Sequence, residues 1–174
     1  GSPLNKINTD YIYIEPNGGA INLGAGTLAL TNATIRDYTV SGLGGGIYVK
    51  DGTAILPDIK LLNNKAGYGG AIAVDANERT ENIDVTIGYD VANPDSILQA
   101  LNYSHSDCPQ ISGNIADEEG GAIYYNANEK TSFKIYCLNE ENNTANGEFA
   151  FHESDFIKTT GKEGIFLLEP KHDN

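Results

Sequence analysis

Short runs of alternating hydrophobic and polar residues recur along the chain, and each run follows a pair of glycines. The phrase Gly-Gly-Ala-Ile occurs at residues 18–21, 69–72 and 120–123, and Gly-Gly-Gly-Ile occurs at 44–47. After each pair, the alternation is typical of a half-buried strand. The predicted inward set is Ile21 and Leu23, Ile47 and Val49, Ile72 and Val74, and Ile123 and Tyr125, with Asn22, Tyr48, Ala73 and Tyr124 on the opposite face.

The spacing of these runs indicates a repeat. The isoleucines at 21, 47, 72 and 123 are separated by 26, 25 and 51 residues, so the last gap is twice the coil length. A fixed period in this range is typical of solenoids, in which each unit buries its apolar face against the next. We therefore predict an all-β fold, a right-handed parallel β-helix of about six coils with irregular terminal caps. The glycine pairs would form its corners.

The same period predicts two further strands, at residues 97–98 and near Phe149, although residues 93–96 carry no glycines. A looser element lies upstream of the glycine pairs, an apolar residue followed three positions later by Asn, at 61–64, 111–114 and 136–139. Asn accepts left-handed backbone, so this element predicts a turn. A β-trefoil would also fit three phrases spaced by 51, but the copy at 44–47 argues against it.

We predict a single domain over residues 1–174, because a chain of this length can bury one substantial core. Residues 1–16 and 152–174 contain off-repeat strands and are expected to cap the ends of a stack formed by 17–151. The pattern is irregular at about 88–110, where either a distorted coil or an inserted loop fits. Excursions from a solenoid often build its binding surface, so this segment is the leading candidate for a functional region.

The glycine phrase together with the upstream apolar-x-x-Asn element resembles the repeats of chlamydial polymorphic membrane proteins. The similarity extends over roughly residues 17–151, although that family's upstream element usually begins with Phe and none occupies that position here. Members of the family are autotransporter passengers and adhesins built as right-handed parallel β-helices. The resemblance implies an extracellular, non-catalytic adhesive module at a bacterial surface.

The composition limits the classes of partner that the chain is expected to bind. The formal net charge of −13 disfavours binding to nucleic acid and to anionic membrane surfaces. No run of about 20 apolar residues is present to cross a bilayer. The chain opens on Gly1-Ser2, which looks like the scar of a cleaved tag, so we expect a fragment of a longer precursor. Host or environmental glycans and proteins remain as partners, and the oligomeric state is left open.

A polysaccharide-degrading, pectate-lyase-like enzyme is the main alternative, because β-helices also host such enzymes. It would need convergent carboxylates and a basic residue. Only Arg36 and Arg79 supply arginine, and neither lies beside an acidic cluster at an identifiable inward or groove position. No cofactor is predicted and no catalytic residue is assigned. Calcium is the one metal considered, with weak candidate ligands at Asp84, Asp90, Asp95 and Asp107, whose spacing matches no calcium loop.

Two cysteines, Cys108 and Cys137, are 29 residues apart, about one coil and three residues. Stacked coils could bring them together, but spacing alone does not establish the pairing geometry, so a disulfide and two free thiols both remain open.

Four aromatic residues are the predicted ligand contacts. Tyr48 and Tyr124 follow equivalent isoleucines and are expected to face outward, where their rings could stack on sugars or proteins. Tyr103 and His105 lie in the irregular segment. The predicted function is therefore a non-catalytic adhesive or ligand-binding module of a bacterial cell-surface or secreted protein. The alternatives are the enzyme described above and a passive stalk.

Overall fold

The computed structural model describes residues 17–105, 107–126 and 128–145, together with two short strands at 156–158 and 168–170. Within these ranges the regular secondary structure is almost entirely β-strand. Coil 1 contains β1 (Ile21–Leu23), β2 (Thr27–Ala29) and β3 (Thr34–Arg36), and coil 2 contains β4 (Ile47–Val49), β5 (Gly52–Leu56), β6 (Lys60–Leu62) and β7 (Lys65–Tyr68). Coil 3 contains β8 (Ile72–Asp75), β9 (Ile83–Ile87), α1 (Ser96–Ala100), β10 (Gln110–Ser112) and β11 (Ile115–Glu119). Coil 4 contains β12 (Ile123–Asn126), β13 (Thr131–Ile135), β14 (Asn139–Glu141) and β15 (Thr144–Ala145).

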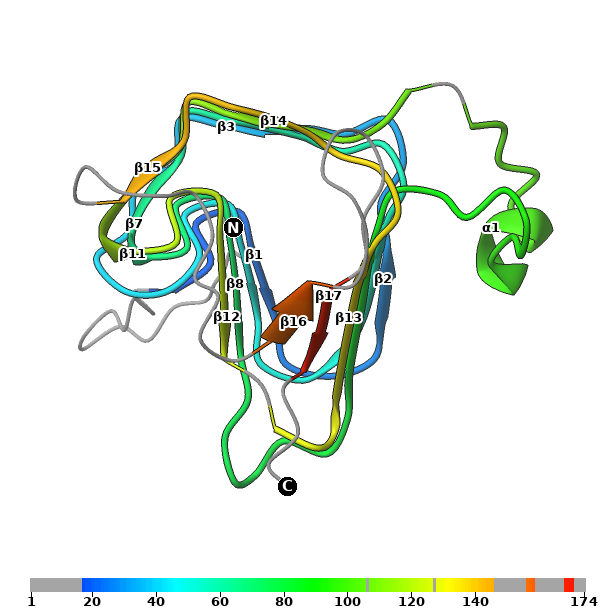
Figure 1. Cartoon of the computed structure of the whole chain (residues 1–174), viewed down its shortest axis with the longest axis horizontal. Helices are drawn as coiled ribbons and strands as arrows, with labels where there is room; N and C mark the ends of the chain where they lie inside the picture. The colour runs from blue at the N-terminus through cyan, green and yellow to red at the C-terminus, as the bar shows by residue number, and fades with distance from the viewer. Residues whose placement is uncertain (1–16, 106, 127, 146–155, 159–167, 171–174) are drawn as a thin grey trace, which may run out of the picture.

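The coils stack as a parallel β-helix, and Figure 1 looks down the stack. Equivalent strands pair in parallel to form four sheets, β1-β4-β8-β12, β2-β5-β9-β13, β3-β6-β10-β14 and β7-β11-β15. In the first sheet, Ile47 is in register with Ile21 and Ile72, and Ile72 is in register with Ile123. This confirms the predicted fold class and the predicted column of isoleucines.

The main core fills the space between the first three sheets. Its columns include the predicted isoleucines and the alternate residues of β9, Ile83, Val85 and Ile87, which are fully buried. In coil 4 an aromatic pair takes this place, with the rings of Tyr125 and Phe133 edge to face and their centroids 4.7 Å apart. Burial of these columns is the main source of stability, at about 25 cal/mol per Å² of apolar surface.

Each glycine pair is required for two separate reasons. The first glycine, such as Gly69, has a φ of +69°, and a Cβ there would lie against the carbonyl of Ile72. The second meets the neighbouring coil: a Cβ on Gly70 would lie 2.7 Å from the backbone N and O of Ile115. The first position therefore requires glycine because of its positive φ, and the second requires glycine because the backbone of the next coil approaches too closely for a Cβ.

The fourth sheet folds back beside the outer face of the first, as Figure 1 shows for β7, β11 and β15 next to β8 and β12. The contact corrects one expectation. Tyr48 was expected to face solvent, but it is only 5 % exposed, and Ala73 in the same column is fully buried. Tyr124 is half-buried and its ring contacts Tyr68 of β7, with centroids 5.1 Å apart. The alternation was predicted, but the burial of Tyr48 and the contact of Tyr124 with β7 were not.

Three buried asparagines, Asn64, Asn114 and Asn143, form a ladder at the turn before the fourth sheet. Asn114 Oδ1 accepts from Asn64 N (2.8 Å) and Nδ2 (3.1 Å), and Asn143 Oδ1 accepts from Asn114 N (2.9 Å) and Nδ2 (2.8 Å). The first two are the Asn of the predicted element, but the third is not. The predicted element at 136–139 is four residues out of register, because Ile111 pairs with Glu140 and not with Tyr136.

Residues 88–109 leave the stack between β9 and β10 and carry α1, which projects to the side in Figure 1. The strand expected at 97–98 is therefore wrong. The 51-residue gap is one coil plus an insertion, and the described residues form four coils. The strand expected near Phe149 and the cap at 1–16 lie outside the described residues. In the region expected to be the other cap, β16 (Phe156–Lys158) pairs antiparallel with β17 (Leu168–Pro170).

Candidate functional site

The excursion, defined as residues 88–109, extends coil 3, and residue 106 within it lies outside the described residues. It begins at Gly88, whose φ of +91° turns the chain out of β9 and whose missing Cβ leaves room for the backbone of Cys137. Near its end, Cys108 forms a disulfide with Cys137 of coil 4, with their Cα atoms 5.4 Å apart. The bond ties the base of the excursion to the next coil.

The single helix of the excursion begins with a local cap. Asp95 Oδ1 accepts from the backbone N of Ile97 (2.8 Å) and of Leu98 (3.3 Å), and Pro94 precedes it. A side-chain oxygen at this position satisfies amides that the helix itself leaves unpaired. Leu98 turns inward and is 1 % exposed. The helix is therefore anchored by one buried leucine and one capping carboxylate.

An aromatic cluster packs the excursion against coil 2. The rings of Tyr89 and His105 are stacked with centroids 5.1 Å apart, and Tyr103 lies 5.4 Å from Tyr89. The Tyr103 hydroxyl donates to Asp58 Oδ2 at 3.0 Å and lies 3.2 Å from His105 Nδ1. Since the phenol has one proton, His105 Nδ1–H donates in return. Partial burial and the Asp58 carboxylate raise the pKa of Tyr103, so it stays protonated at neutral pH.

The structure brings two of the predicted ligand residues together, Tyr103 and His105. Tyr48 and Tyr124 lie apart from them on β4 and β12 of the first sheet, where Tyr124 contacts Tyr68 of β7. The residues that contact Tyr103 and His105 in this cluster, Tyr89 and Asp58, were not predicted. Asp58 lies in the short link between β5 and β6, 45 residues before Tyr103 in the sequence. Only the stacking of coil 3 on coil 2 brings these two residues together. The sequence signal that could have indicated Asp58 was its position in coil 2, in the link that corresponds to the excursion of coil 3.

The four aspartates considered as calcium ligands are used separately. Asp95 caps α1, while Asp90 accepts from the backbone N of Ala92 (3.0 Å) and Asn93 (3.2 Å). Burial and the charge of Asp90, to which the Tyr136 hydroxyl is hydrogen-bonded, raise the pKa of that tyrosine. Asp84 lies on β9 and Asp107 is exposed. Among the described residues, no three His, Cys, Asp or Glu side chains are grouped to hold a metal.

The excursion carries several exposed apolar side chains. Val91 is 74 % exposed, Leu101 58 % and Ile97 39 %, so three of the five exposed large hydrophobic residues in the described ranges belong to this segment. Residues 88–109 also contain three aspartates and neither lysine nor arginine. The excursion therefore presents apolar side chains within an acidic surround.

Comparison with known proteins gives one similarity. The Chlamydia polymorphic membrane protein repeat matches residues 110–126, which span β10, β11 and the first sheet's β12. No curated protein matches the chain significantly, and no solved structure does. The repeat match and the stacked parallel sheets fit a β-helical passenger of that kind. Within the described ranges, no helix has the length and apolar character to cross a membrane.

Proposed function

We propose that this chain is the adhesive module of a bacterial surface protein, in which the stacked coils form the scaffold and the excursion binds a protein partner. The match to a membrane-protein repeat of Chlamydia supports the surface location. The matched segment contains the residues that build the fold. Ile111 belongs to a buried column, Asn114 to the asparagine ladder, and the glycine phrase at 120–123 forms a corner.

The observation that carries the proposal is the exposure of Val91, Ile97 and Leu101 on one insertion. Leaving such side chains in water is unfavourable by about 1.5–3 kcal/mol each relative to burial, and clustered exposed apolar residues mark interaction sites. A loop that served only to connect β9 to β10 would not need them.

Two further features favour binding. The disulfide, the capped helix and the stack of Tyr89 on His105 hold the excursion in one shape, and such preorganisation lowers the entropic cost of association. The aspartates and the absence of lysine and arginine favour a partner whose surface combines apolar residues with positive charge.

The test is a binding screen with one matched pair of variants. The chain is applied to an array of purified extracellular proteins and to a glycan array. The test variant carries Val91→Ser, Ile97→Ser and Leu101→Ser. The control carries Tyr38→Ser and Ile115→Ser, which remove the other two exposed hydrophobic residues, 40 % and 45 % exposed, away from the excursion.

We expect saturable binding to at least one protein, weakened at least tenfold, or about 1.4 kcal/mol, in the test variant and unchanged in the control. Equal weakening in both variants would show that binding depends on exposed apolar surface in general and not on the excursion, which would contradict the proposal. Binding to no protein would favour the passive stalk, and turnover of uronate polymers would favour the polysaccharide-degrading enzyme.

A further inference from the structure

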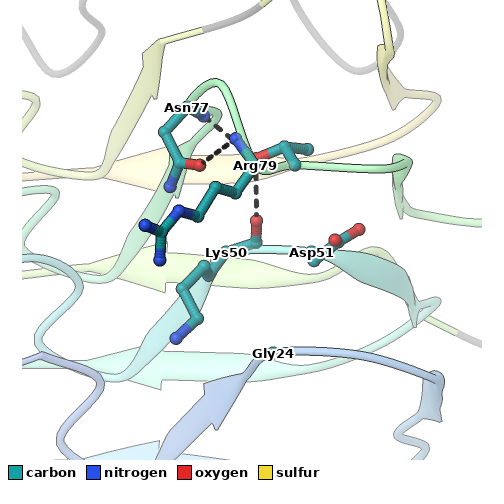
Figure 2. A pocket seen from close by; sticks show the side chains of 6 residues that line it. Gly24, Lys50, Asp51, Asn77 and Arg79 are labelled. Carbon is teal, nitrogen blue, oxygen red and sulfur yellow. Dashed lines mark hydrogen bonds between the residues drawn. The ribbon is translucent and has the colours of Figure 1, made fainter.

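A second surface lies on another side of the stack. It is a hollow of about 330 Å³ lined by Gly24, Lys50, Asp51, Asn77, Arg79 and Thr80. These residues occupy the turns that join the first sheet to the second in coils 1, 2 and 3. Figure 2 shows the side chains of Lys50 and Arg79 extending the same way from neighbouring coils, with Asp51 directed to the other side.

The turn that carries Arg79 is rigid. Asn77 Oδ1 accepts from Arg79 N at 2.7 Å, Thr80 Oγ1 accepts from Asn77 N at 2.9 Å, and the Thr80 hydroxyl donates to Lys50 O at 3.2 Å. The last bond ties the coil 3 turn to the coil 2 turn. The backbone that presents the two cations is therefore fixed by internal hydrogen bonds.

Coil 4 repeats this turn with a second cation. Asn-Glu-Arg-Thr at 77–80 is followed by Asn-Glu-Lys-Thr at 128–131. Asn128 Oδ1 accepts from Lys130 N at 2.8 Å, and Asn128 Nδ2 donates to Asn77 O at 3.3 Å. The two turns are thus stacked copies, so Lys50, Arg79 and Lys130 lie on three successive coils, whose strands are about 4.8 Å apart.

None of these three cations forms an ion pair within the described residues. The two ion pairs there are Arg36 with Asp37 and Lys65 with Asp117, and neither involves Lys50, Arg79 or Lys130. The lining carboxylate, Asp51, accepts from the backbone N of Gly52, Glu81 and Asn82 at 2.8–3.0 Å. The charge of Lys130 also contributes to lowering the pKa of Asp51, so this lysine is within electrostatic reach of that carboxylate without forming an ion pair with it. The neighbouring acidic residues Glu78, Glu81 and Glu129 are exposed.

We infer that the row of Lys50, Arg79 and Lys130 binds an acidic polysaccharide whose carboxylate or sulfate groups lie along the stack. A polymer with regularly spaced anions can engage all three cations, whereas a small anion engages one. The amide and hydroxyl groups of Asn77 and Thr80 suit sugar hydroxyls. Nucleic acid is less well matched, because the lining has no aromatic ring for base stacking and the chain carries a net charge of −13.

The inference is tested by titrating the chain with polygalacturonate, heparin, neutral dextran and single-stranded DNA, at about 50 and 300 mM NaCl. The test variant carries Lys50→Gln, Arg79→Gln and Lys130→Gln. The control carries Lys60→Gln, Lys65→Gln and Lys134→Gln, which remove the same charge from exposed positions on β6, β7 and β13. Circular dichroism and thermal unfolding establish that both variants fold.

We expect at least one acidic polysaccharide to bind at low salt, more weakly at high salt, and at least tenfold more weakly to the test variant than to the control. The identity of the polymer separates carboxylate from sulfate recognition. Equal loss in both variants, or no binding at low salt, overturns the inference. DNA binding through the same three residues would assign the row to nucleic acid. The excursion variant should bind the polysaccharide normally, so the two proposals fail separately.

Discussion

At the scale of residues, the turn between the third and fourth sheets explains the recurrence of asparagine. The residues just before the ladder, Asp37, Asn63, Gly113 and Asn142, all have φ between 56° and 69°. Asn, Asp and Gly are the residue types that accept this conformation. The next position is filled by a ladder asparagine in coils 2 to 4, so each Asn-Asn or Gly-Asn pair supplies a left-handed turn and a side-chain hydrogen bond across coils.

The ladder predicts a stability effect. Asn114→Leu keeps the volume but removes the side-chain hydrogen bonds to Asn64 and Asn143. It also leaves the carbonyl of Leu61, now 3.0 Å from Nδ2, without this donor. We expect the free energy of unfolding to fall by about 3 kcal/mol, measured by urea denaturation. The matched change Asn139→Leu, on an exposed strand position, should shift it by less than about 0.5 kcal/mol. If both substitutions lowered the free energy of unfolding equally, the ladder would make no special contribution to stability.

A pH effect belongs to Asp51. Hydrogen bonds from the backbone of Glu81, Asn82 and Gly52 lower its pKa below the usual 3.8. Because the folded-state pKa is depressed, the carboxylate contributes stability above about pH 4, and that contribution disappears as the pH falls through the lowered value.

We therefore expect Asp51→Asn to be less stable than the parent at pH 7 and the difference to shrink below pH 4, in urea unfolding from pH 7 to 2.5. Glu78→Gln, which removes one charge from an exposed position on a neighbouring turn, serves as the control. A difference between parent and Asp51→Asn that stays constant with pH would contradict the assignment.

At the scale of elements, the features that depend on local backbone conformation could be predicted from the sequence. The features that depend on packing between parts of the chain far apart in sequence could not. The glycine corners were predictable because no other residue fits their φ and their contacts. The burial of Tyr48 was not, since the alternation along β4 does not show what covers its outer face. The strand expected at 97–98 arose because the excursion is close to one coil in length, although Pro94 and Asp95 are helix-start signals.

The disulfide is the element that fixes the excursion to the stack. Replacing Cys108 and Cys137 by serine frees a loop of 29 residues in the unfolded chain. We expect the free energy of unfolding to fall by about 3–4 kcal/mol and limited proteolysis to begin within residues 88–109. The same effects should follow reduction of the parent chain. Reductant should leave the serine variant unchanged, and equal protease resistance before and after reduction would show that the cluster around Tyr103 holds the excursion alone.

At the scale of the whole molecule, the charge balance opposes compaction. A net charge of −13 concentrates negative charge on a narrow stack, and screening by salt relieves this repulsion. The parallel pairing of strands far apart in sequence also means that each coil is stabilised mainly by its two neighbours.

We expect the thermal midpoint to rise by about 2–5 °C between about 10 and 150 mM NaCl, measured by differential scanning fluorimetry. Calcium chloride at matched ionic strength separates screening from binding. Equal shifts would attribute the effect to screening, whereas a larger shift with calcium would revive a site among Asp84, Asp90, Asp95 and Asp107. A midpoint that falls with NaCl would contradict the repulsion.

The attachment of the excursion has a consequence for how such a protein diversifies. Coil 2 joins β5 to β6 through residues 57–59 alone, while coil 3 makes the equivalent connection through 88–109, and the strands on either side keep the same pairing. The length and sequence of this insertion are therefore free to change without repacking the interior. Selection by a host, or an engineer, could exchange one recognition loop for another while inheriting the same framework intact.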